Sequence, residues 1–306
     1  MTTTLSNMID EVLINLAGYS LTQDKATYLT APITTLTSPS SAPTTISLGS
    51  ADNLGKGIVE IDEELLYVDS YDKVGKTGVV APFGRGYLGS TPATHAADSK
   101  VTISPTFPRA IIKRNINDTI KGMGNALQAI KTATFTFVGA QSAYGFNNLN
   151  IQTVLKLEWQ VPGPSQEWKA IRRWDFDSKA DTDVWGAGAQ VITIRDSVLP
   201  GRTVKVTYFT DPVSFTDSSQ DFIEQTGLPE SARDVVILGA AWRSIAYLDP
   251  ARASMTSPQA DETNAKRPYG SSNSAAKQLY AFYTQRLNEE VKRQQQLYPP
   301  KIHYTR

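Results

Sequence analysis

The hydrophobic period changes four times along these 306 residues, and this constrains the fold more than any other feature. Apolar residues recur at three- and four-residue steps, the spacing of an amphipathic helix, over residues 5–16, 112–130, 235–248 and 279–297. Between them, short apolar runs and alternation with polar residues are typical of strands, at 58–103 and 134–208. The pattern predicts an α+β fold, with a discontinuous helical bundle interrupted by two β insertions.

The same changes of period give the expected parts of the chain. In order, these are the N-terminal helix of the bundle (1–30), a small β insertion with a glycine-rich loop (31–107), a bundle helix (108–131), a larger β-sandwich insertion (132–213), the C-terminal bundle helices (214–298) and an extended tail (299–306). An inserted unit must return the chain close to its point of departure. Each β unit is therefore expected to project from the bundle.

Three local features are also predicted. The Thr-, Ser- and Pro-rich residues 31–50 indicate an extended connection, and the polar residues 253–274 indicate a loop. Ser231 to Asp234 resembles a capping box at a helix start. The helix that starts at Pro108 is expected to carry its apolar stripe as far as Ile130.

Composition excludes several classes of function. Thirty basic and thirty acidic side chains leave no net charge to attract nucleic acid or an anionic membrane. The chain has no cysteine, which excludes disulfides and thiolate sites. It also has neither a signal-like N-terminus nor a long apolar run. With only two histidines, His95 and His303, a histidine-rich metal cluster is impossible, and we expect no metal, cofactor or catalytic residues.

The glycine-rich stretch between Phe83 and Val101 formally matches the dinucleotide motif G-x-G-x-x-G, but Pro92 follows where a helix should begin. Residues 49–57 likewise fall short of a P-loop by one residue of spacing. We therefore predict a structural loop, in which the side chain of His95 holds backbone groups. Its residues are Gly84, Arg85, Gly86, Gly89 and His95.

Charged and aromatic clusters elsewhere in the sequence are interpreted mainly as structural or solvent-exposed features. The acidic run 62–64 is expected to be a solvated turn, and the basic pairs 113–114 and 172–173 to be solvated faces. Glu289 and Arg293 have the spacing of a helical ion pair. Four tryptophans of the larger β insertion favour a packed core, or alternatively a surface for sugar rings or a partner: Trp159, Trp168, Trp174 and Trp185.

Several of these segments together resemble a known family. Residues 58–68, 83–101 and 107–118 resemble virion proteins of tailed bacteriophages. The closing segments 226–229, 234–243 and 280–293 are similar to the helices of phage head-to-tail adaptor (connector) proteins. The large insertion from Thr132 to Asp211 departs from the shortest adaptors of this kind.

The resemblance implies a structural role without catalysis. Such adaptors form a ring, usually of twelve subunits, which docks beneath the portal, extends the DNA channel and offers a platform to the next neck or tail protein. Helices within 108–130, 229–249 and 275–297 would form the ring wall, and the sandwich would face a spike, a fibre or a neighbouring subunit. The tail would reach the portal through Pro299, Pro300, Lys301, Ile302, His303, Tyr304 and Arg306.

The resemblance also implies a place for the protein: the neck or tail of the virion, and the host cytoplasm before assembly, without membrane contact. Two alternatives stay open. The chain could be a minor tail or baseplate protein, or its tryptophan-rich sandwich could be a carbohydrate-binding module.

Overall fold

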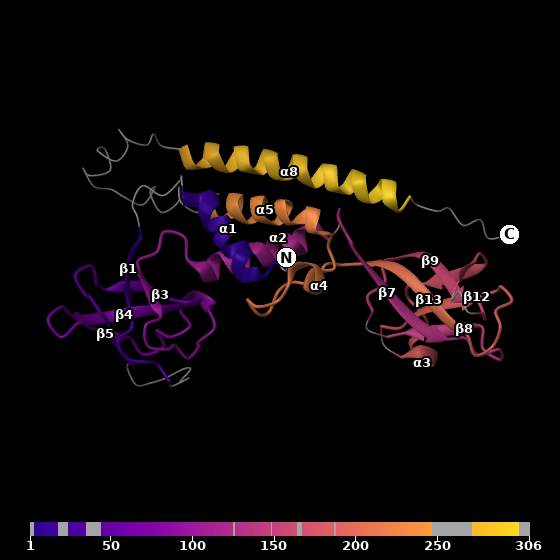
Figure 1. The fold of residues 1–306 in the computed structure, drawn as a ribbon, viewed down its shortest axis with the longest axis horizontal. Coiled ribbons are helices and arrows are strands. Elements are labelled where there is room, and N and C mark those ends of the chain that lie inside the picture. Colours follow the sequence, from indigo (N-terminus) through magenta and orange to yellow (C-terminus); the bar gives the residue numbers. More distant parts are fainter. Residues whose placement is uncertain are drawn as a thin grey trace. The chain divides into compact units, whose positions relative to one another are not determined.

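The computed structural model describes residues 3–17, 24–34, 44–124, 126–147, 149–163, 167–186, 188–246 and 271–299. It confirms the α+β class, with helices and antiparallel sheets (Figure 1). The chain forms two compact units. The first comprises Met1–Leu5, Asn117–Val236 and Phe282–Arg306, and the second Ser6–Ile116 and Ile237–Ala281. Each unit therefore combines segments that are distant in sequence.

A six-stranded antiparallel sheet dominates the second unit, in the order β1-β6-β3-β4-β5-β2. Its strands are β1 (Lys25–Tyr28), β2 (Thr44–Ser47), β3 (Gly57–Ile61), β4 (Glu64–Asp72), β5 (Thr77–Val80) and β6 (Lys100–Ile103). Just past the two end strands, Leu29 pairs with Leu48. Thr30 N–H donates to Ser47 O and Gly49 N–H to Tyr28 O, each at 2.9 Å. These bonds close the sheet on itself as a small barrel.

The interior of this barrel holds the apolar residues that the strand prediction used. Val59, Ile61, Leu66, Val68 and Val101 belong to one buried cluster. The strands predicted between 58 and 103 are confirmed as β3, β4, β5 and β6. The expected connection at 31–50 is wrong in part, because residues 44–47 are strand β2, paired with β5 through Thr44↔Val80 to Ser47↔Thr77. Residues 35–43 lie outside the described part.

Four long helices follow the predicted stripes: α1 (Leu5–Ala17), α2 (Arg109–Met123), α5 (Arg233–Ala246) and α8 (Ser271–Leu297). On α1, the periodic residues Met8, Ile9, Val12 and Leu16 are fully buried. Within the second unit, the Arg109 guanidinium pairs with Asp10 of α1. The Asn115 amide donates to the Ser244 hydroxyl of α5 at 2.9 Å. Polar bonds therefore fix these helix segments as well as apolar burial.

Three local predictions are wrong. Helix α2 ends at Met123, before Gly124, and Ile130 belongs to a strand, where it pairs with Phe209. Glycine is a poor helix former, and strand pairing decides the conformation of Ile130. There is no capping box at Ser231, which lies in a short 3-10 helix (Glu230–Ala232) and donates to Glu290 at 2.8 Å. Helix α8 includes residues 271–274 of the expected loop, and residues 253–270 lie outside the described part.

The first unit contains two antiparallel sheets. Strands β7 (Ala129–Thr136), β9 (Thr153–Gln160), β10 (Trp168–Ile171) and β13 (Thr203–Thr210) form one in the order β10-β9-β13-β7. Strands β8 (Ala143–Phe146), β11 (Trp174–Asp177) and β12 (Gln190–Ile194) form the other in the order β11-β12-β8. One buried cluster contains side chains of both sheets, among them Leu157, Ile192 and Val204.

Short helices complete the described elements: α3 (Thr182–Trp185), α4 (Phe222–Thr226) and the 3-10 turn Tyr87–Gly89. Asp221 caps α4 by accepting the N–H groups of Ile223 and Glu224. No helix in the described part of the chain is both long and apolar enough to cross a membrane.

Candidate functional site

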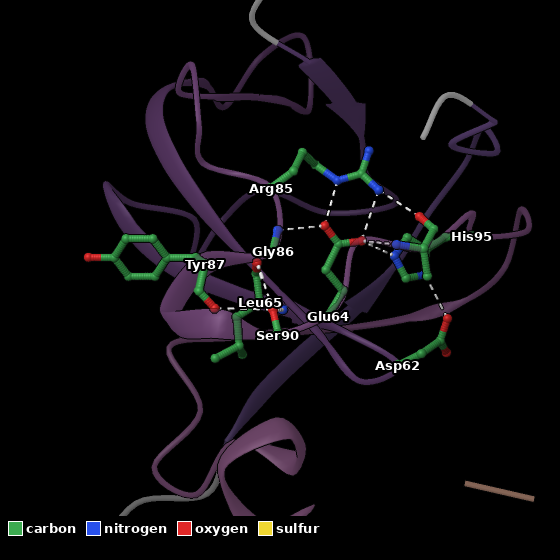
Figure 2. A network of polar contacts seen from close by, with 9 residues as sticks. Asp62, Glu64, Leu65, Arg85, Gly86, Tyr87, Ser90 and His95 are labelled. Carbon is green, nitrogen blue, oxygen red and sulfur yellow. Dashed lines mark hydrogen bonds and ion pairs between the residues drawn. The ribbon is translucent and has the colours of Figure 1, made fainter. Parts of the chain in front are cut away.

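The glycine-rich loop of the second unit is built around one buried carboxylate. Glu64 is the first residue of β4 and is 1% exposed. It follows a tight turn from β3, in which Asp62 adopts the left-handed backbone conformation, with φ of 56°. The turn directs Glu64 toward residues 85–95, which are distant in sequence but surround its two oxygens (Figure 2).

Five donors bind the Glu64 carboxylate. Arg85 grips it with two nitrogens, Nε to Oε1 at 2.6 Å and Nη2 to Oε2 at 2.8 Å. The N–H groups of Gly86 and Ala93 donate to opposite oxygens at 2.9 Å, and His95 Nε2 lies 2.9 Å from Oε2. This is the complete set of partners expected for a buried carboxylate, and it joins both ends of the loop to β4.

The same contacts fix the protonation states. Burial by itself would raise the pKa of Glu64, but the hydrogen bonds from Arg85, His95 and the two backbone amides outweigh it and lower that pKa to about 2. For His95, burial favours the neutral ring, but contacts with Glu64 and Asp62 outweigh it and raise the pKa above 6.5. His95 Nδ1 lies 2.8 Å from Asp62 Oδ2, so the ring bridges two carboxylates. The cluster is an ionic lock.

Glycine is required at two points of this loop. A Cβ on Gly86, whose φ is 61°, would lie 2.8 Å from both Pro92 Cγ and Ser90 O. A Cβ on Gly84 would lie 2.8 Å from the carbonyl oxygens of Ala81 and Tyr67. Ser90 adds a further tie, because its hydroxyl accepts the N–H of Leu65 at 2.9 Å. The backbone thus passes very close to itself beside the carboxylate.

The structure brings the predicted loop residues together but corrects two expectations. The His95 ring contacts carboxylates instead of backbone groups, and it is the His95 backbone that pairs, with Ile33. Within the acidic run 62–64, Glu64 is buried, not solvated. The sequence did contain an indication: Glu64 directly precedes the apolar pair Leu65 and Leu66, and the cation Arg85 lies among the glycines of the predicted loop. Pro299 is exposed, and the predicted tail residues from Pro300 onward lie outside the described part.

A cavity of about 360 Å³ lies in the same unit, and sequence reasoning missed one of its lining residues, Glu60. Glu60 is 5% exposed and lines the cavity with charged side chains that include Asp24, Lys100 and Arg109. Its Oε1 accepts the N–H of Arg109, at the start of α2, at 2.5 Å. Burial outweighs this bond and raises the pKa of Glu60 to about 7. The sequence did indicate this residue, because Glu60 stands within an apolar strand between Val59 and Ile61. The side chains of these two neighbours lie on the opposite face of β3.

These groups do not make a metal centre. In the described ranges, no group of three or more His, Cys, Asp or Glu side chains could hold a metal ion. The polar atoms of the loop are occupied with one another, and Arg85 also donates to Ala93 O at 2.6 Å. What the arrangement does chemically is to hold a loop in one conformation.

The other predicted clusters are dispersed. Trp168 is 38% exposed on β10, with Lys205 Nζ 4.1 Å from its ring centre, whereas Trp159 and Trp174 pack against the core shared by the two sheets. The tryptophans therefore do not form one platform.

The basic pair 113–114 is not simply solvated, since Lys113 pairs with Glu63 at 2.9 Å and Arg114 donates to Leu88 O. The predicted helical pair is replaced by Arg286–Glu289 and Arg293–Glu290.

Comparisons with known proteins find no family model that matches the chain and no match among curated proteins.

Proposed function

We propose that this chain is a structural, non-enzymatic protein of a tailed-phage virion and a subunit of the ring that joins head to tail. One observation carries the proposal: the loop on which the resemblance rests is a self-contained ionic lock. Arg85 and His95, the side chains with which such a loop could bind or transform a small molecule, are buried and bound to Glu64. A loop of this construction suits a rigid contact surface better than a reaction centre.

The proposal includes an architecture. In it, the amphipathic helices would form a discontinuous bundle, and the two β units would project from it, as the sequence pattern predicts. The near balance of charge agrees with a channel wall through which DNA must slide, because strong attraction would retain it. A ring also needs heterologous contacts repeated around an axis, for which projecting units offer surface.

The direct test is assembly with the portal. Purified chain is mixed with the portal protein of the same virion, and complexes are examined by size-exclusion chromatography with light scattering and by negative-stain microscopy. We expect a ring seated on the portal. A chain that ends at Pro299 should fold, as judged by circular dichroism, and bind the portal more weakly. A full-length chain that stays monomeric with excess portal contradicts the proposal.

Position in the particle separates the neck from the alternatives. Labelled antibody against the chain should mark the vertex below the capsid opening, at a copy number that matches a ring. Label at the distal end of the tail would favour a minor tail or baseplate protein. For the carbohydrate alternative, glycan binding that is lost in Trp168→Ala and in Trp174→Ala would favour a sugar-binding module over the adaptor. The two tryptophans lie on strands of different sheets, so each variant tests its own part of the predicted surface.

A further inference from the structure

Strand β7 of the first unit has an open edge. It is the last strand of its sheet, and among the described strands it pairs only with β13. Next to it, Phe137 donates its N–H toward β13, to Arg202 O at 2.8 Å. Because these directions alternate along a strand, Ile130, Thr132, Thr134 and Thr136 direct their N–H and C=O groups away from β13. Among the described residues, none bonds to them on that side.

This edge lacks the usual protection against pairing. Proteins shield edge strands by making them short, or with prolines, bulges or inward-pointing charges. The opposite edge, β10, has four residues, of which one is Lys169. Strand β7 has eight residues, no proline and one charge, Lys131, near its start. The three threonines Thr132, Thr134 and Thr136 are exposed, so the open groups are accessible.

The chain leaves its last helix at the foot of this edge. Tyr298, which follows α8, stacks edge-on against Phe209, the partner of Ile130, with ring centres 6.3 Å apart. Gln294 of α8 exchanges two hydrogen bonds with the backbone of Gln128, immediately before β7. Ile130 and Tyr298 also line one apolar groove of about 260 Å³. All these residues belong to the first unit.

The sequence beyond this point has the pattern of a half-buried strand. After Pro299 and Pro300, which favour an extended backbone, Lys301-Ile302-His303-Tyr304-Thr305-Arg306 alternates polar with apolar residues. Six residues of strand span about 20 Å, close to the length of the free edge from Ile130 to Thr136. On an added strand, Ile302 and Tyr304 would extend the apolar face of Ala133 and Phe135, and Lys301, His303 and Thr305 would continue the threonine face.

We propose that residues 301–306 add to the free edge of β7 in the same molecule, as a fifth strand parallel to it. The direction follows from where the segment starts. It begins beside Ile130 and can follow the free edge only toward Thr136, which is the direction in which β7 itself runs. The occupant is the chain's own segment because a tether of a few residues gives it a high effective concentration at this edge. The inference concerns the isolated chain and does not depend on the proposed virion role.

Cross-linking tests the contact, since the chain has no cysteine of its own. His303→Cys is combined in turn with Thr132→Cys, Thr134→Cys and Thr136→Cys, and with Ala170→Cys on the opposite edge as control. After mild oxidation, we expect an intramolecular disulfide in at least one of the three test pairs and none in the control. A disulfide between two molecules would overturn the proposal in favour of a second copy, and the absence of any disulfide would overturn it outright.

Hydrogen exchange supplies an independent readout on the isolated chain. Tyr304→Pro removes an N–H and disfavours the strand, and Tyr304→Phe is the matched control. The amides of Ile130, Thr132, Thr134 and Thr136 should exchange about tenfold faster in Tyr304→Pro than in the wild type, with no change in Tyr304→Phe and none at β10. Equal exchange in all three proteins would overturn the proposal. Because no portal is present, either outcome leaves the assembly test unaffected.

Discussion

Glu60 and Glu64 lie four residues apart on adjacent strands of one barrel, both almost fully buried, yet they differ in charge state. Five donors bind Glu64 and hold its pKa near 2, whereas one backbone amide binds Glu60, whose pKa is about 7. Both carboxylates are buried, so the number and the charge of the donors around each one decide its charge. The two strands of the hairpin therefore place their carboxylates in different roles. Glu64 holds the loop, and Glu60 accepts a hydrogen bond from the first residue of helix α2 beside a cavity.

Arg85→Ala should have the largest effect on this comparison. It removes both guanidinium bonds and leaves Glu64 buried without its main counter-charge, which costs about 3–5 kcal/mol of unfolding free energy. Urea unfolding measures the loss. The control is Lys56→Ala, which breaks an exposed pair with Asp69 and should cost less than about 1 kcal/mol. Equal losses of unfolding free energy in the two variants would mean that the buried pair of Arg85 and Glu64 stabilises the fold no more than an exposed pair does.

Glu60→Gln should act in the opposite direction. The folded pKa of about 7 lies above the ordinary 4.5, so the stabilising contribution of Glu60 is complete below pH 4.5 and is lost as the pH rises through 7. Glutamine keeps an acceptor for the Arg109 N–H but has no charge to bury. Relative to the wild type, the variant should gain about 2–3 kcal/mol between pH 4.5 and 7. Parallel pH profiles of unfolding free energy for the two proteins would refute this assignment.

His95→Gln should give a smaller, pH-dependent loss. The pKa of His95 is raised, so its contribution is complete below pH 6.5 and disappears as the pH rises through the folded value. Below pH 6.5 we expect a loss of about 1–2 kcal/mol relative to the wild type. Chemical denaturation at several pH values checks this, and a difference that grew with pH would contradict it.

Asp62→Asn should change little. The Asp62 side chain is 58% exposed, and asparagine tolerates the positive φ at this turn, so a loss below about 1 kcal/mol is expected. Thermal unfolding at neutral pH is sufficient to measure it. A loss as large as that of Arg85→Ala would shift the centre of the lock from Glu64 to Asp62.

Periodic burial was predictable, but long-range polar pairing was not. The stripe on α1 and the strands around Val59 and Val101 follow from spacing, because one face must be covered. Strand β2 has only Ile46 as a large apolar residue, and its conformation depends on pairing with β5. Glu64 and Arg85 are 21 residues apart, and no local rule links an acid to its partner across such a distance. The loop could therefore be predicted as structural, but not the residue around which it is built.

The pairing of Leu29 with Leu48 has a mechanical consequence. An open sheet can unzip from a terminal strand, one ladder at a time. Here the bonds between residues 28–30 and 47–49 join the two terminal strands, so fraying of either strand must also break these bonds. This seam therefore opposes the loss of a terminal strand from the barrel.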